Sequence, residues 1–165
     1  MKLREFRLDD YEEIVNMYYD FNTEVYGSFR KIGSKYFYYK IVQDWINTNR
    51  HIIVSVDKTN TITGFSLCYI DNFNGLTETI YNCEICYVKP SYRNTRAAYL
   101  LYNNGYNKAK ELGLNIYTSG RIENNVDKLM SNHFNLEPKF INMEGQTKWV
   151  LVEVNQVVQV VVQEH

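Results

Sequence analysis

The spacing of apolar residues switches between two patterns along the chain. Alternating segments predict strands, whereas apolar residues three and four positions apart predict helices. The pattern predicts strands over 2–8, 51–56, 61–70, 81–88, 114–118, 140–143 and 149–154, and helices over 10–21, 36–47, 98–112 and 122–134. Residues 22–35, which include Gly27 and Gly33, are predicted to form a loop or a broken helix. Asn74-Gly75 predicts a hairpin before the strand over 81–88.

The stretch from Tyr81 to Gly113 carries the clearest functional signal. A strand is predicted to end before Pro90, which has no backbone donor, and a turn then leads into an amphipathic helix. Gly113 stands where a helix C-cap glycine is expected. A strand that passes through a turn into a helix directs several free backbone N–H groups at one point. This arrangement predicts an anion-binding site.

The same stretch resembles the pyrophosphate-binding segment of the GNAT superfamily, the acyl-CoA-dependent N-acyltransferases. In that family a strand ending near V-x-P is followed by R/Q-x-x-G-x-G/A at the start of a helix. This sequence has Val88-Lys89-Pro90 and then Arg93-Asn94-Thr95-Arg96-Ala97-Ala98. Arg96 stands in the usual glycine position, which looks like the R-x-x-R-A-G variant of a bacterial and phage subgroup.

The resemblance covers residues 1–154 and implies a single GNAT domain of the α/β (α+β) class. Its expected core is a mixed, mostly antiparallel sheet of about seven strands, flanked by about four helices. Residues 155–165, NQVVQVVVQEH, follow as a valine-rich tail. The tail has the composition of an added strand, and it is a candidate contact for a homodimer or a larger assembly.

Acetyl-CoA is the co-substrate that the resemblance implies, with no metal. The expected CoA-binding positions are Cys86, Tyr87, Val88, Arg93, Asn94, Thr95, Arg96, Ala97, Ala98 and Asn124. Asn124 matches an asparagine that contacts the pantetheine arm in the family, although it is also suited to cap a helix.

The catalytic candidates that follow from the resemblance are Glu84 and Ser131. Glu84 is expected to act as general base. It would take the proton through water as a primary amine attacks the thioester directly. The alternative for Glu84 is a solvated position or a salt bridge. Ser131 replaces the family's tyrosine and is a far weaker acid than a phenol, whose pKa is about 10. The thiolate is therefore expected to leave directly or through water.

An N-acetyltransferase with an unidentified amine acceptor is thus the leading interpretation. The alternative is a GNAT-like domain that has lost catalysis and serves as a binding or structural module, for example in a phage particle. Tyr36, Tyr38 and Tyr39 are candidates for lining an acceptor pocket, or for simply covering the core.

Composition limits the number of domains, the classes of binding partner and the cellular compartment that the sequence can be expected to have. The 165 residues are 45% hydrophobic, enough for one domain with a core, and the formal net charge of −1 gives no case for nucleic acid or an anionic membrane surface. No apolar run approaches the roughly 20 residues that span a bilayer. Three cysteines without a secretion signal favour reduced thiols in the cytoplasm.

Cys83 and Cys86 form a C-x-x-C pair, but residues three apart on a regular strand point to opposite faces. No second cysteine pair completes a metal site, so buried structural thiols are expected.

Overall fold

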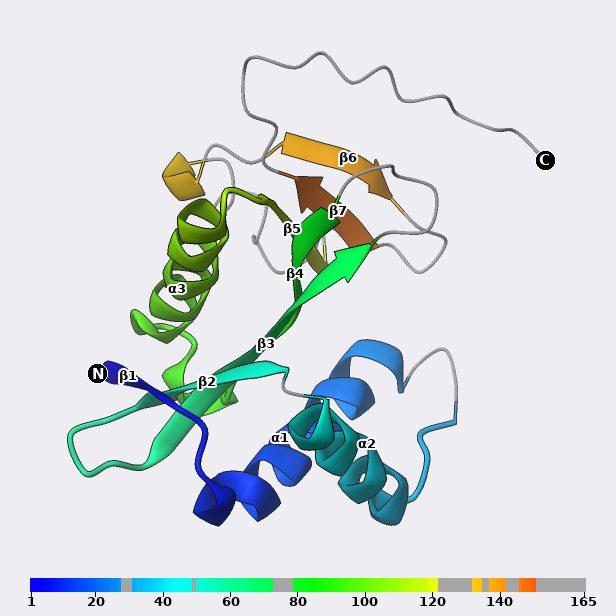
Figure 1. The fold of residues 1–165 in the computed structure, drawn as a ribbon. Helices are drawn as coiled ribbons and strands as arrows, with labels where there is room; N and C mark the ends of the chain where they lie inside the picture. Colours follow the sequence, from blue (N-terminus) through cyan, green and yellow to red (C-terminus); the bar gives the residue numbers. More distant parts are fainter. Residues whose placement is uncertain are drawn as a thin grey trace.

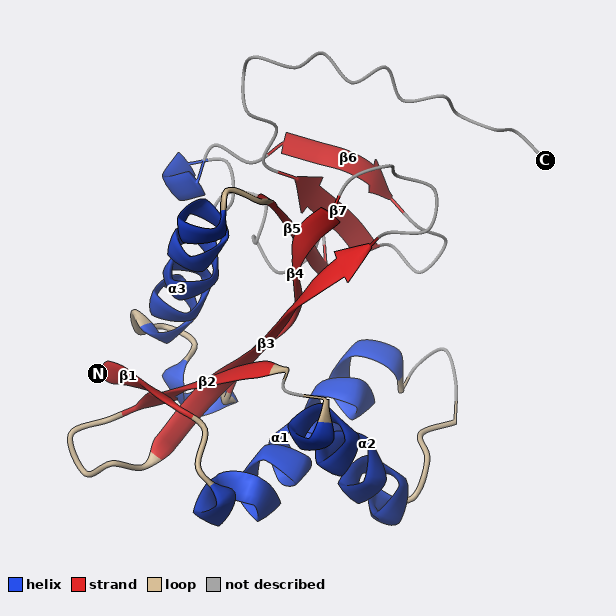
Figure 2. Cartoon of the chain, in the orientation of Figure 1, coloured by secondary structure: helices blue, strands red, loops and turns tan. Residues whose placement is uncertain are grey.

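The computed structural model describes residues 1–27, 31–48, 50–72, 79–121, 132–134, 137–141 and 146–150. Within these residues, seven strands form one sheet, accompanied by three long α-helices and two short 3-10 helices (Figures 1 and 2). The elements in chain order are β1 (Lys2–Glu5), η1 (Leu8–Asp10), α1 (Tyr11–Tyr26), α2 (Lys35–Asn47), β2 (His51–Val56), β3 (Ile62–Asn72), β4 (Thr79–Val88), η2 (Pro90–Tyr92), α3 (Ala97–Leu112), β5 (Asn115–Arg121), β6 (Glu137–Ile141) and β7 (Gln146–Val150).

The strand order in the sheet is β1-β2-β3-β4-β5-β7-β6. Every neighbouring pair is antiparallel except β4 and β5, which run parallel and are joined through α3. Helix α3 covers one face of the sheet, and α1 and α2 cover the other (Figure 1). The α/β class and the mixed, mostly antiparallel sheet are thereby confirmed.

Each face of the sheet has its own apolar core. The α1/α2 side buries Ile14, Met17, Val42, Trp45, Phe65 and Leu67, among others. The α3 side buries Leu101, Tyr102 and Ala109 against the opposite surface of the central strands. Both cores converge on β3 and β4, which hold the candidate site between the two layers of helices.

Helix α1 is longer than the sequence pattern predicts. Residues 22–26, predicted as a loop or a broken helix, continue the helix to Tyr26 without a break. Asn22 is buried, and its side-chain amide donates to the Tyr18 carbonyl oxygen at 2.8 Å. Thr23 donates to the Tyr19 carbonyl oxygen at 2.9 Å. These polar residues keep their hydrogen bonds within the helix, so the composition that indicated a loop does not end it.

The closing strands lie about three residues earlier than predicted, at 137–141 and 146–150. Pro138 lies within β6, which is an edge strand, where a residue without an N–H is tolerated. The predicted turn at Asn74-Gly75, most of the predicted helix over 122–134 and the tail over 155–165 lie outside the described residues. Of that helix, residues 132–134 are described and are helical.

Asp10 fixes the junction between β1 and α1. Its carboxylate accepts hydrogen bonds from Arg4 Nη1 at 2.6 Å, Arg4 Nη2 at 2.8 Å and the Arg7 backbone N–H at 2.8 Å. Only 8% of the Asp10 side chain and 14% of the Arg4 side chain are exposed. The bidentate pair satisfies both carboxylate oxygens at once, which a buried charge requires.

Gly64 allows β3 to approach β4 closely near the end of β4. A Cβ atom at this position would lie 2.7 Å from the Tyr87 carbonyl oxygen and 3.1 Å from Val88 Cγ2. We expect Gly64→Ala to lower the free energy of unfolding by about 1–3 kcal/mol, because a backbone oxygen cannot rotate away. Chemical denaturation measures this loss. Gly33→Ala is the matched control, since its Cβ would meet only ordinary contacts with Phe37. Equal stability of Gly64→Ala and the natural protein would contradict the tight approach.

Candidate active site

Strands β4 and β5 separate to form a fork in the sheet. They pair only from Ile80–Asn115 to Cys83–Thr118. Beyond that point β4 continues to Val88 against β3, while β5 continues to Arg121 against β7. Among the described residues, this separation leaves one edge of β4 without a strand partner beyond Cys83.

Backbone donors line the β4 side of the fork. The Lys89 N–H donates to the Thr63 carbonyl oxygen on the β3 side at 2.9 Å. Because neighbouring residues of a strand direct their N–H groups to opposite edges, the Tyr87 N–H also points to β3. The Cys86 and Val88 N–H groups therefore point into the fork.

A β-bulge interrupts β4 at Glu84. Leu67 pairs with Ile85 and Cys68 pairs with Cys83, which leaves Glu84 as an extra residue without an opposite partner. The extra residue shifts the alternation of side chains by one position. Residues on the two sides of the bulge that are an odd number apart can therefore point to the same face of the sheet.

The expectation that Cys83 and Cys86 point to opposite faces is wrong because of this bulge. Both side chains pack on the α3 side, and Cys83 Sγ lies 2.8 Å from Cys68 Sγ. All three thiols are free. Contact with Cys68 and burial raise the pKa of Cys83, and burial raises the pKa of Cys86. Within the described residues no group of three or more metal-ligating side chains occurs.

Glu84 lies on the other face, at the surface. Its side chain is 46% exposed, and its Oε2 lies 3.3 Å from Arg50 Nη1. The position is therefore both solvated and salt-bridged, and water reaches the carboxylate, as a water-mediated base requires.

The turn between β4 and α3 forms the other half of the site. Pro90–Tyr92 is a 3-10 turn, residues 93–96 continue as turn, and α3 begins at Ala97. The Thr95 hydroxyl donates to the Tyr92 carbonyl oxygen at 2.6 Å and accepts from the Ala97 N–H at 3.3 Å. The first amides of a helix have no helical acceptor, so those at the start of α3, apart from the Ala97 N–H that Thr95 accepts, are available to an anion.

The two arginines of this turn differ in their contacts. Arg93 Nε donates to the Val88 carbonyl oxygen at 3.0 Å, and its Nη2 donates to Glu24 on α1 at 2.5 Å. Arg96 is exposed, with its guanidinium carbon 5.9 Å from the centre of the Tyr99 ring. Asn94 is also exposed, whereas Ala97 is buried and Ala98 half-buried. Arg93 thus stabilises the turn, and Arg96 extends from it.

Asn124 and Ser131 lie outside the described residues. The other candidates gather along β4 and the start of α3, with Glu84 at the bulge and residues 93–98 beyond the end of the strand. The Tyr87 side chain is an exception among the CoA-binding candidates, because it packs on the α1/α2 side.

Sequence reasoning missed the groups around Glu84. Arg50 lies against Tyr69, and the Asn82 side-chain amide donates to the Tyr69 hydroxyl at 3.0 Å. Burial and the charge of Glu84 raise the pKa of Tyr69 to about 12. The alternation of apolar and polar residues predicts that Tyr69 lies in a strand. Nothing in the residues around Tyr69 predicts its contact with Arg50, which is distant in sequence.

A hollow of about 450 Å³ lies between α1 and α2, lined by Tyr18, Asn22, Lys31, Ile32, Gly33, Phe37 and Tyr38. Burial raises the pKa of Tyr18, and the negative charge of Glu84 also raises it. Tyr18 is therefore a lining residue of this hollow whose pKa responds to the charge of Glu84. Tyr38 is the one tyrosine of the predicted acceptor trio that lines it.

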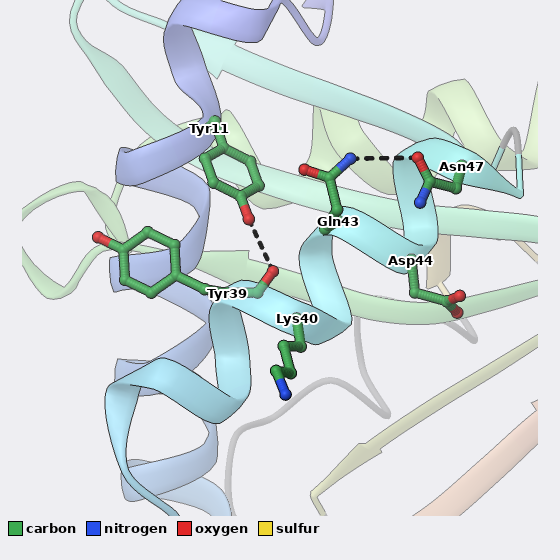
Figure 3. Close-up of a pocket in the computed structure, with 6 residues that line it drawn as sticks. All are labelled: Tyr11, Tyr39, Lys40, Gln43, Asp44 and Asn47. Atoms are coloured by element: carbon green, nitrogen blue, oxygen red, sulfur yellow. Dashed lines mark hydrogen bonds between the residues drawn. The ribbon is translucent and has the colours of Figure 1, made fainter.

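A second hollow lies on the outer surface of the same helices (Figure 3). Tyr39 lines it together with Tyr11, whose hydroxyl donates to the Tyr39 carbonyl oxygen at 2.7 Å. Tyr36 is 67% exposed. Of the predicted catalytic and CoA-binding residues that the structure describes, none lines this second hollow. Among the described residues, no helix has the length and hydrophobicity to cross a bilayer.

Comparisons with known proteins agree with this geometry. Residues 11–128 match the model of the acetyltransferase (GNAT) family. No curated protein matches the sequence significantly.

Similar solved structures include a ribosomal-protein-alanine N-acetyltransferase from Brucella melitensis, with TM-score 0.71, 11% identity and coverage of 93% of this chain and 100% of that one. The PaiA N-acetyltransferase from Thermoplasma acidophilum, in complex with coenzyme A, has TM-score 0.66, 12% identity and coverage of 90% and 96%. YncA from Salmonella typhimurium, with acetyl-CoA, has TM-score 0.68, 14% identity and coverage of 99% and 98%. By its family match and its fold, this chain belongs to the GNAT acetyltransferase family.

Proposed function

We propose that the protein transfers an acetyl group from acetyl-CoA to a primary amine by direct attack. The fork between β4 and β5, continuous with the exposed turn before α3, is the observation that carries this proposal. The fork is a groove that fits an extended ligand such as the pantetheine arm, and the turn beside it is a binding site for an anion. Two of the similar structures contain CoA or acetyl-CoA by their descriptions.

In this proposal the CoA pyrophosphate binds the amides of Asn94, Arg96 and Ala98, and the pantetheine arm runs along β4. The Thr95 and Ala97 N–H groups already donate within the turn. The Cys86 and Val88 N–H groups would hold the arm, since both point into the fork. Tyr87 is not given a contact with CoA in this proposal, because its side chain packs on the α1/α2 side and its backbone pairs with β3. Thr95 stabilises the turn. Asn124 is proposed to contact the pantetheine amide.

The chemistry follows from the groups at the fork. The amine nitrogen attacks the thioester carbon, the carbonyl oxygen gains negative charge, and the C–S bond breaks. Glu84 accepts the amine proton through water, for which its exposure allows room. The Ser131 hydroxyl is too weak an acid to protonate the leaving thiolate. The thiolate can leave without that proton, because its parent thiol has a pKa of only about 8.5.

The contacts of Arg93 favour a second candidate, a GNAT domain without catalysis. The resemblance assigns this arginine to the phosphate loop, yet its guanidinium is held by Glu24 and Val88. A protein that keeps the fold but binds a different partner would tolerate that arrangement.

Release of the free CoA thiol separates the two candidates. The protein is incubated with acetyl-CoA and, one at a time, with amino acids, polyamines, aminosugars and lysine peptides, and the thiol is measured by a colorimetric reagent. We expect amine-dependent release with at least one class, above the rate without amine. No amine-dependent release, despite tight binding of acetyl-CoA, would favour the non-catalytic candidate.

Arg96 provides a test of the phosphate site. If its side chain contacts a CoA phosphate, Arg96→Ala should weaken acetyl-CoA binding by about 1–3 kcal/mol, the scale of a hydrogen bond to a charged group. Arg96→Gly restores the usual family loop and should have a smaller effect. Calorimetric titration of the three proteins measures this order. Equal affinities would show that Arg96 is only a solvated residue at the start of the helix.

A further inference from the structure

Arg50 places a cation between a carboxylate and an aromatic ring. Its Nη1 lies 3.3 Å from Glu84 Oε2, and its guanidinium carbon lies 4.2 Å from the centre of the Tyr69 ring. A positive charge near a ring face and a carboxylate is stabilised by both. The Glu84 carboxylate and the Tyr69 ring thus form a small binding site for a cation.

The carboxylate and the ring are held by the sheet rather than by Arg50. Glu84 projects from the β-bulge of β4, and Tyr69 belongs to β3. The Asn82 side chain, opposite Tyr69 in the register, donates to the Tyr69 hydroxyl at 3.0 Å. Burial keeps this phenol neutral, since it raises the Tyr69 pKa to about 12. The ring therefore keeps its position when the arginine moves, and the β-bulge fixes the backbone from which the Glu84 carboxylate extends.

Arg50 itself is attached less firmly. Its backbone N–H donates to the Trp45 carbonyl oxygen at the end of α2, and its long side chain extends to the site. The Arg50 and Glu84 side chains are 29% and 46% exposed. Ion pairs with this exposure are weak, so another cation can replace the guanidinium at small cost.

We propose that Glu84 and Tyr69 form the recognition site for the acceptor amine in its ammonium form, and that Arg50 occupies this site until the acceptor binds. This inference rests on the proposed function, and it specifies the substrate class as alkyl primary amines that are cationic at neutral pH. Once bound, the ammonium gives one proton through water to Glu84, and the resulting neutral amine attacks the thioester carbon with its lone pair. As the C–S bond breaks, the second proton passes from the nitrogen through water to the leaving thiolate, so the products are the amide and the CoA thiol, and Glu84 returns its proton to solvent.

The competing role for Arg50 is to orient Glu84. The two roles predict opposite effects of removing the guanidinium. If Arg50 orients the carboxylate, Arg50→Met weakens amine binding or leaves it unchanged. If Arg50 competes with the acceptor, Arg50→Met strengthens the binding of a cationic amine.

Binding of n-pentylamine, measured calorimetrically without acetyl-CoA, tests the inference independently of turnover. We expect Arg50→Met to bind n-pentylammonium about three- to tenfold more tightly than the natural protein, the range expected for releasing a weak ion pair and a cation–π contact. The neutral 1-pentanol should show no such gain. Lys40→Met is the matched control, because Lys40 also lies over a tyrosine ring, at 5.0 Å from that of Tyr36.

Two further variants in the Arg50→Met background identify the site. Adding Glu84→Gln or Tyr69→Leu should remove the gain, and thermal unfolding checks that each variant is folded. Equal or weaker binding of n-pentylammonium by folded Arg50→Met would overturn the inference, as would an equal gain in Lys40→Met. The proposed function fails by a different result, the absence of amine-dependent thiol release.

Discussion

Replacing Glu84 by glutamine is expected to lower kcat by about 10²–10⁴-fold while acetyl-CoA affinity stays nearly unchanged. Glutamine has nearly the same shape and can still accept a hydrogen bond from Arg50, but it cannot take the proton of the amine. The residue lies at the bulge, short of the Cys86 and Val88 amides proposed to hold the pantetheine arm. Thiol release gives kcat, and calorimetry gives the affinity for acetyl-CoA.

Glu111→Gln makes the same chemical change at an exposed glutamate that pairs with Lys108 on α3, remote from the bulge in sequence. We expect this control to keep its activity. Full activity of Glu84→Gln would refute the assigned base while leaving the acetyltransferase intact. Ser131→Ala should change the rate little, because a serine hydroxyl is a poor proton donor here.

Replacing Asp10 by alanine is expected to lower the free energy of unfolding by about 3 kcal/mol, because it leaves the half-buried Arg4 charge without its partner. It also removes the acceptor of the Arg7 N–H at the entry to α1. Chemical denaturation measures the loss. Asp9→Ala, at an exposed neighbour, is the control and should change stability little. A comparable loss in both variants would show that the bidentate contact is not the cause.

The Asp10 contribution should also depend on pH. Burial alone would raise the pKa of Asp10, but hydrogen bonds from Arg4 and the Arg7 N–H lower it below the ordinary 3.8. A carboxyl whose pKa is lower in the folded protein stabilises the fold above its unfolded pKa. That stabilisation is lost as the pH falls through the folded pKa. The difference between the natural protein and Asp10→Ala should therefore be constant at neutral pH and shrink below 3.8.

The sequence predicted the parts of the fold that depend on neighbouring residues. The path from Tyr81 through the turn to Gly113 is local, since Pro90 ends a strand and Gly113 caps a helix with a φ of 67°. The bulge at Glu84 was not predictable in this way. It exists because β3 and β4 differ by one residue in register, a property of the pair. That single residue places Cys83 and Cys86 on the same face.

The candidate site was predicted in part for the same reason. Residues 93–98 and Glu84 belong to one continuous segment, so a motif could identify them. Arg50 is 34 residues before Glu84 and reaches it only through the packing of α2 and β2 beside β3. The hollow lined by Tyr18 and Phe37 also depends on how α1 and α2 pack, and apolar spacing alone does not give that geometry.

Calorimetric titration with acetyl-CoA, compared with S-acetylpantetheine, tests the central claim most directly. The compounds share the thioester and the pantetheine arm, but S-acetylpantetheine lacks the nucleotide and its pyrophosphate. If the fork holds the arm and the start of α3 holds the pyrophosphate, acetyl-CoA should bind at least about tenfold more tightly, or about 1.4 kcal/mol. No binding of acetyl-CoA at about 1 mM, or equal affinity for both compounds, would contradict the account.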